Sequence, residues 1–222
     1  MATAIFFASS TGNSEEIASK IASSLNNIEV FDLSGTKIEK INDYDKIIFG
    51  GSTWGDGELN DDWEDVWGDF CKLDFSSKTI ALFGLGDQES YSDEFCSALG
   101  LIYEQVKSMN ANVIGFTSSE GYYHDASKAQ IDDKFVGLVI DEDNQSDLTD
   151  ERIKNWVNEI KEDLDFFEDE LSKYEYIIDL GKKLEAFDEK DKISENIVHG
   201  CTSQVWLTHE IKDGKMYFHG TS

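Results

Sequence analysis

Short apolar runs and amphipathic stretches alternate along most of the chain. Runs typical of strands occupy residues 4–7, 30–33, 46–50, 79–84, 112–116 and 135–141. Apolar positions at helical spacing lie between most of them, at residues 17–25, 63–71, 92–109 and 149–164, whereas residues 38–41 amount to at most one turn. Strands that alternate with helices in this way predict an α/β fold with a doubly wound parallel sheet and helices on both faces.

Loops rich in glycine and hydroxyl side chains follow three of the predicted strands. They read "SSTGNS", "GGSTWGDGELND" and "GLGDQESY", after the first, third and fourth strands. Because ligands of such sheets bind at the carboxyl ends of the strands, the three loops are expected to converge on one ligand.

The first of these loops, residues 9–14, lies between a strand and a helix. Backbone N–H groups and the helix dipole point at one spot in such a loop, which predicts an anion site, most often for phosphate. The loop lacks the lysine of a Walker motif and the three spaced glycines of a dinucleotide fingerprint, so both are excluded. Taken alone, the loop is equally consistent with an ordinary Ser/Thr-rich helix cap.

Two large aromatic residues lie in the other loops, Trp54 in the second and Tyr91 in the third. Rings at both sides of a site suit a flat heteroaromatic ligand, which they contact by stacking. Core packing is the alternative role for either ring. Their place in glycine-rich loops at strand ends favours binding.

The pattern changes near residue 165. Residues 166–187 predict one more helix, and residues 205–220 predict a β-hairpin about Asp213 and Gly214. We therefore expect two domains, 1–165 and a smaller one over 166–222.

The chain is strongly acidic, with 46 Asp and Glu against 19 Lys and Arg and a formal net charge of −27. This charge argues against nucleic acid and anionic membranes as partners and favours basic proteins. No apolar run approaches the ~20 residues of a membrane span, and the N-terminus has no secretory pattern. The cysteines and histidines of the chain match no metal-ligand spacing, so we expect no metal, reduced thiols and a cytoplasmic protein.

The chain resembles the flavodoxins over roughly residues 2–164. The resemblance rests on "SSTGNS", "STWGDGEL", "GLGDQESYSDEF" and "GLVIDEDNQSDLTDERIKNWV". Residues 117–141 look like the extra loop that splits the fifth strand in long-chain members, which implies a five-stranded sheet. The family implies noncovalently bound FMN and a low-potential, monomeric carrier of single electrons, not an enzyme, that serves a reductase and electron acceptors.

The resemblance also implies which residues surround FMN. The residues implied around the phosphate are Ser9, Ser10, Thr11, Gly12, Asn13 and Ser14. Those along one flavin face are Thr53, Trp54, Gly55 and Asp56, and those along the other are Gly86, Asp87 and Tyr91. Asp143 matches a position near the ribityl chain. The carboxylates between residues 56 and 65, with no cation in these loops, are expected to disfavour the fully reduced flavin anion and so lower its potential. Solvation alone is the other explanation for this run of charge.

A second resemblance covers residues 171–221, to the SufE-type sulfur-acceptor proteins of iron-sulfur cluster assembly. It rests on "YEYIIDLGKKL" and "NIVHGCTSQVWL". In that family the matching cysteine accepts sulfur from a cysteine desulfurase, which designates Cys201, although the segment looks truncated against family members. The alternatives are that Cys201 is an inert thiol, or that the chain is an accessory factor in cluster assembly.

Overall fold

The computed structural model describes residues 3–25, 28–161, 164, 187, 189–197, 205–212 and 215–221. The chain divides into two compact units, residues 1–168 and residues 169–222. Within the described residues, no helix is long and apolar enough to cross a membrane.

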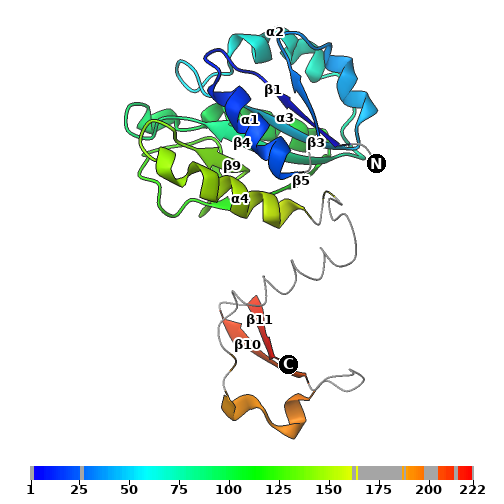
Figure 1. The fold of residues 1–222 in the computed structure, drawn as a ribbon, viewed down its shortest axis with the longest axis vertical. Coiled ribbons are helices and arrows are strands. Elements are labelled where there is room, and N and C mark those ends of the chain that lie inside the picture. Colours follow the sequence, from blue (N-terminus) through cyan, green and yellow to red (C-terminus); the bar gives the residue numbers. More distant parts are fainter. Residues whose placement is uncertain are drawn as a thin grey trace. The chain divides into compact units, whose positions relative to one another are not determined.

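A parallel sheet forms the centre of the first unit (Figure 1). Its strands are β1 (Thr3–Phe7), β2 (Glu29–Asp32), β3 (Lys46–Ser52), β4 (Thr79–Leu85) and β5 (Asn112–Ile114), in the order β2-β1-β3-β4-β5. The fifth position is shared: β5 pairs with the first half of β4, and β9 (Leu138–Ile140) pairs in parallel with its second half. The predicted five-stranded, doubly wound sheet is thus confirmed, with its last strand split.

Helices cover both faces of this sheet (Figure 1). Helices α1 (Asn13–Ser24) and α4 (Thr149–Ile160) share a core with Ile5, Phe7 and Ile48. Helices α2 (Asp61–Phe70) and α3 (Ser97–Ser108) share the other core, with Phe6 and Phe49. Successive residues of a strand face opposite sides, so these buried apolar strands supply both cores.

At two places a residue with positive φ ends or delays an expected element. The helix expected from residue 92 is a short 3-10 turn, η2 (Ser92–Glu94), and α3 begins only after Cys96, whose φ of 53° interrupts the helical path. The strand expected over 112–116 ends at Ile114, because Gly115 has a φ of 79°. The one-turn stretch near residue 38 is the 3-10 helix η1 (Ile38–Asp43).

Residues 117–135, which we call the insertion, separate β5 from β9. They contain β6 (Thr117–Ser118), β7 (Gln130–Ile131) and β8 (Lys134–Phe135), a small antiparallel sheet in the order β6-β8-β7. Phe135 is buried and packs beside Phe95 and Tyr122. A further 3-10 turn, η3 (Ser146–Leu148), leads into α4.

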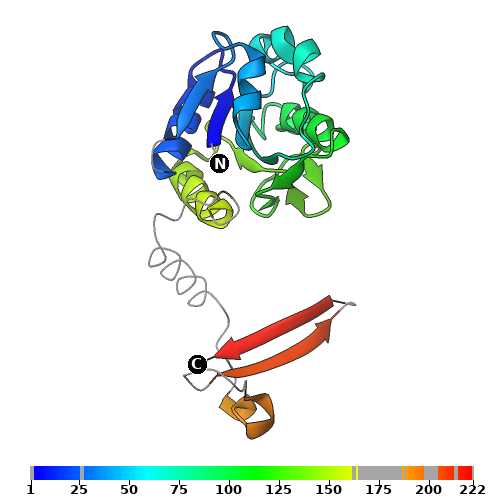
Figure 2. The same ribbon diagram turned by 90° about the vertical axis from the view of Figure 1, so that its right-hand side faces the viewer.

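The second unit contains the predicted hairpin. Strands β10 (Trp206–Lys212) and β11 (Lys215–Thr221) pair antiparallel along their whole length (Figure 2). Two 3-10 turns precede them, η4 (Glu189–Asp191) and η5 (Ser194–Asn196). The helix expected over 166–187 falls almost entirely outside the described residues, and Cys201 and the Asp213–Gly214 turn lie outside them as well.

Candidate functional site

A cavity of about 340 Å³ opens at the carboxyl edge of the parallel sheet. Four loops line it, those that follow β1, β3, β4 and β9. The lining residues are Thr11, Asn13, Ser52, Thr53, Trp54, Gly55, Leu85, Gly86, Asp87, Tyr91, Glu94, Phe95, Glu142 and Asp143. The expected convergence of loops therefore occurs where open α/β sheets bind ligands.

The loop after β1 presents unpaired polar groups. Gly12 is the N-cap of α1 with a φ of 95°, and its N–H donates to Ser9 Oγ at 3.1 Å, which holds the turn. Ser14 Oγ is buried and, within the described residues, has no hydrogen-bond partner. The first N–H groups of a helix also have no partner inside the helix. A buried hydroxyl beside these N–H groups fits an anion such as phosphate.

A buried amide connects this loop to the next one. Asn60 Nδ2 donates to Ser10 Oγ at 3.4 Å, while Asn60 Oδ1 accepts from the backbone N–H of Trp63 at 3.3 Å and so caps α2. Asn60 is almost fully buried. The N-cap of α2 thus fixes one hydroxyl of the first loop.

The loop after β3 is a tight turn that carries Trp54. Trp54 and Glu58 exchange two backbone hydrogen bonds, of 3.0 and 2.7 Å, around Gly55 and Gly57, whose φ values are 49° and 84°. Trp54 Nε1 donates to Ser52 Oγ at 2.9 Å. Trp54 lines the cavity although 41% of the residue is exposed, and Tyr91, which also lines it, is 62% exposed. Such exposed rings at a cavity are apolar area that a bound aromatic ligand would cover.

One carboxylate organises the loop after β4. Asp87 Oδ1 accepts from the N–H of Glu89 at 3.0 Å, from the N–H of Ser90 at 2.8 Å and from Asn144 Nδ2 at 2.8 Å. Burial opposes ionisation of Asp87, but these donors outweigh it and lower the pKa of the carboxyl to about 2. Asp87 is therefore ionised at neutral pH and holds the loop that carries Tyr91.

A second carboxylate, Asp141, joins this loop to the one after β9. It is fully buried, and it accepts from Gln88 Nε2 at 2.7 Å and from the N–H groups of Gln88, Asp143 and Asn144 at 3.0–3.2 Å. Asp141 is not among the site residues predicted from the sequence, although an acidic residue directly after an apolar run could have indicated it. These donors supply the hydrogen-bond partners that a buried polar side chain needs.

The predicted site residues fall into two groups. Nine of them line the cavity: Thr11, Asn13, Thr53, Trp54, Gly55, Gly86, Asp87, Tyr91 and Asp143. Ser9, Ser10, Gly12, Ser14 and Asp56 belong to the same loops but are not among the lining residues. The lining residues that were not predicted are Ser52, Leu85, Glu94, Phe95 and Glu142.

Other candidate groups lie apart from the cavity. Asp62 and Asp65 of the acidic run line a separate hollow with residues 33–37. Cys96 is fully buried at the N-cap of α3, where burial raises the pKa of its thiol well above the ordinary value. Within the described residues, no group of three or more His, Cys, Asp or Glu forms a candidate metal site.

Comparison with known proteins gives two family matches. Residues 5–156 match the model described as flavodoxin, and residues 158–222 match one described as Fe-S metabolism associated domain. A flavodoxin of Picosynechococcus sp. is 46% identical over 160 residues, and one of Helicobacter pylori is 48% identical over 157; each alignment covers 71% of this chain and 94% of the relative. The structure of Fusobacterium nucleatum flavodoxin bound to flavin mononucleotide superposes with a TM-score of 0.69 at 30% identity, covering 73% of this chain and 98% of that one.

Proposed function

The chain belongs to the flavodoxin family, and from this premise we propose that its first unit binds FMN noncovalently and carries single electrons at low potential between redox proteins. The observation that carries the proposal is the cavity itself. Hydroxyl and amide groups of Thr11 and Asn13 line it together with the exposed rings of Trp54 and Tyr91. One space therefore offers partners for a phosphate and for a flat ring system.

The residues of the first loop hold the phosphate in this proposal. The N-terminus of α1 directs its dipole and free N–H groups at the anion, and the buried Ser14 hydroxyl gains the partner that it otherwise does not have. Glu15 and Glu16 in the first turn are exposed, and residues 9–14 of the loop contain no charged side chain.

Trp54 and Tyr91 enclose the ring system and keep water from its faces. When bound, FMN supplies one-electron redox chemistry, and the protein supplies its binding and its electrostatic surroundings. Gly55 has a φ of 49°, in the left-handed region that residues with a Cβ adopt only rarely, so the Gly55–Asp56 peptide is our candidate for a group that turns toward the ring.

The purified protein tests this assignment directly. It is expected to be yellow and to release FMN on denaturation, because the site has one anion-binding loop. Release of FAD, or no flavin binding after addition of FMN to the apoprotein, would contradict the proposal.

Replacement of Thr11 by Val tests the phosphate end. We expect FMN affinity to fall about tenfold, since one hydrogen bond to a charged group is worth about 1.5 kcal/mol or more, while riboflavin affinity changes little. Fluorescence titration of the apoprotein measures both. Thr36→Val, in the loop after β2, is the matched control, and equal losses for FMN and riboflavin would place Thr11 elsewhere.

The partners in this proposal are a reductase and electron acceptors with basic surfaces. Of the charged residues, 34 acidic and 12 basic ones lie in residues 1–165, so the acidity belongs mainly to the unit with the cavity. Opposite charge steers such encounters and makes their rate fall as salt rises.

The match of residues 158–222 favours a second candidate function, sulfur transfer in iron-sulfur cluster assembly with Cys201 as the acceptor. The experiment is incubation of the whole protein with a cysteine desulfurase and labelled cysteine. This function predicts label on Cys201, lost in Cys201→Ser and retained in Cys71→Ser, because a thiolate must attack the donor persulfide. No label above the Cys201→Ser background would remove this candidate.

A further inference from the structure

A lysine of the insertion is fixed on helix α3 by its backbone. The N–H of Lys128 donates to Oγ of the buried Ser97 at 3.1 Å. Its carbonyl lies so close to Gly100 that an added Cβ there would be 2.2 Å from the oxygen. Two contacts with α3 therefore hold the backbone of Lys128, from which its side chain extends.

The side chain extends from this anchor to the cavity wall. Lys128 Nζ lies 3.0 Å from Glu94 Oε2, and Glu94 lines the cavity. Oε2 itself is buried, while the two side chains as a whole are 48% and 32% exposed. The Ser97 hydroxyl and the Lys128 ammonium together lower the pKa of Glu94, so the carboxylate is ionised at neutral pH.

The ion pair also lies against the loop that carries Trp54. A Cβ added to Gly57 would be 2.1 Å from Glu94 Oε2 and 3.0 Å from Lys128 Nζ. A Cβ added to Gly55 would be 2.6 Å from Glu58 Oε2. The carboxylates of Glu94 and Glu58 thus pack on the two glycines of this turn. The ammonium of Lys128 compensates the charge of Glu94.

From these contacts we propose that Lys128 is a positioning residue of the cofactor site, which neutralises Glu94 beside Gly57 and so raises the potential at which bound FMN accepts its second electron. The inference rests on the proposed function. The step adds one electron, from a reduced partner protein or from dithionite in the test, and breaks no bond of the protein. It adds negative charge to the cavity, so an uncompensated Glu94 carboxylate would oppose it. The acidic run at residues 56–65 contains no cation, and the insertion supplies one at residue 128.

Potentiometric titration of the whole FMN-loaded protein, followed by absorbance, tests the proposal. We expect Lys128→Met to make the second one-electron potential more negative by about 30 mV, which is about threefold in the equilibrium constant. Glu94→Gln should shift it in the opposite direction. The double variant should lie near the wild type, because both charges of the pair are gone, and Lys128→Arg should keep the wild-type potential. The Lys128→Met shift should shrink as ionic strength rises.

Lys134→Gln is the matched control, since it removes the same charge from an exposed position of the same insertion that does not line the cavity. If Lys128→Met shifts the potential no more than Lys134→Gln, or if the two single shifts simply have the same sign, the proposal is wrong. If the Lys128→Met variant does not bind FMN, the potentials of Lys128→Gln and Glu94→Gln are compared in the same way. A wild-type protein that binds no FMN would instead overturn the proposed function.

Discussion

At the scale of single residues, Asp87 couples the stability of the Tyr91 loop to pH. Its carboxyl has a pKa of about 2 against an ordinary value of 3.8, because the Ser90, Asn144 and Glu89 donors outweigh the opposing effect of burial. A lowered pKa stabilises the folded protein above the ordinary value, and this stability is lost as pH falls from 3.8 toward 2.

We therefore expect Asp87→Asn to lower the free energy of unfolding by about 1–2 kcal/mol at pH 7. The difference from the wild type should diminish as the pH falls below 4. Urea unfolding of the apoprotein over a series of pH values measures it. Asp147→Asn, at an exposed position of η3, is the control, and a deficit independent of pH would show that the ionised carboxylate is not the cause.

The sequence predicted nine of the residues that face the cavity, but it did not predict the contact between Glu94 and the distant Lys128. Trp54 and Tyr91 stand out because large rings are unexpected in glycine-rich loops at strand ends. Glu94 was visible in the sequence, but its pairing with Lys128 depends on how the insertion folds back over α3. Such a contact across more than 30 residues leaves no periodic signal in the chain.

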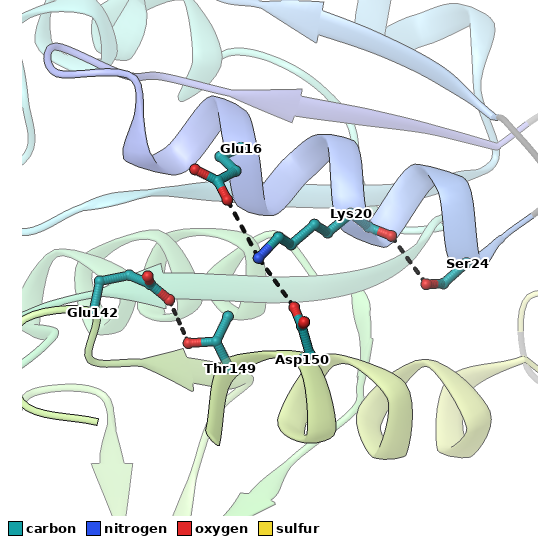
Figure 3. A network of polar contacts seen from close by, with 6 residues as sticks. All are labelled: Glu16, Lys20, Ser24, Glu142, Thr149 and Asp150. Carbon is teal, nitrogen blue, oxygen red and sulfur yellow. Dashed lines mark hydrogen bonds and ion pairs between the residues drawn. The ribbon is translucent and has the colours of Figure 1, made fainter. Parts of the chain in front are cut away.

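At the scale of elements, a single lysine joins the two helices that cover one face of the sheet. Lys20 Nζ of α1 lies 3.0 Å from Asp150 Oδ1 in the first turn of α4 and 3.2 Å from Glu16 Oε1 (Figure 3). The next residue toward the N-terminus of α4, Thr149, donates its hydroxyl to Glu142, which lines the cavity. Lys20 thus connects α1 to the first turn of α4, and Thr149 connects that turn to a residue that lines the cavity.

A double-mutant cycle of Lys20→Met and Asp150→Asn measures the α1–α4 ion pair. We expect a coupling free energy of only about 0.5 kcal/mol, because the Asp150 side chain is 83% exposed and water screens the pair. The coupling should fall further in 0.5 M salt. A Lys20→Met and Glu16→Gln cycle gives the within-helix pair for comparison, and a coupling above 2 kcal/mol would mean that the surface-pair description is wrong.

The types of the main elements were predictable because apolar runs and helical spacing are strong signals, but their ends were not. Cys96 adopts φ 53° although it is not glycine, and nothing in its sequence neighbourhood indicates that α3 starts after it. Gly115, in contrast, was a visible candidate for the end of β5. The resemblance to the long-chain members implied that two short strands share the fifth sheet position, but local residue patterns alone do not encode their pairing with β4.

At the scale of the whole molecule, the two units match two different family models. All fourteen residues that line the cavity precede residue 144. Leu164 is buried in the core that α1 and α4 share. The flavodoxin relatives align with only 157–160 residues of this chain and are covered over 94% of their own length. The first unit therefore contains all the residues that line the cavity.

We accordingly expect a chain that ends after Leu164 to keep the FMN affinity of the full protein within about twofold and to be reduced by a flavodoxin reductase at the same rate. Fluorescence titration and stopped-flow absorbance measure the two quantities. Leu164→Ala in the full chain shows that the assays detect damage at this boundary, since loss of a buried Leu side chain costs about 2–3 kcal/mol of stability. If the shortened chain binds FMN as the full protein does but is reduced more slowly, residues 165–222 contribute to the encounter with the reductase. A loss of FMN affinity with unchanged stability would mean that these residues complete the site, contrary to the placement of all its lining residues in the first unit.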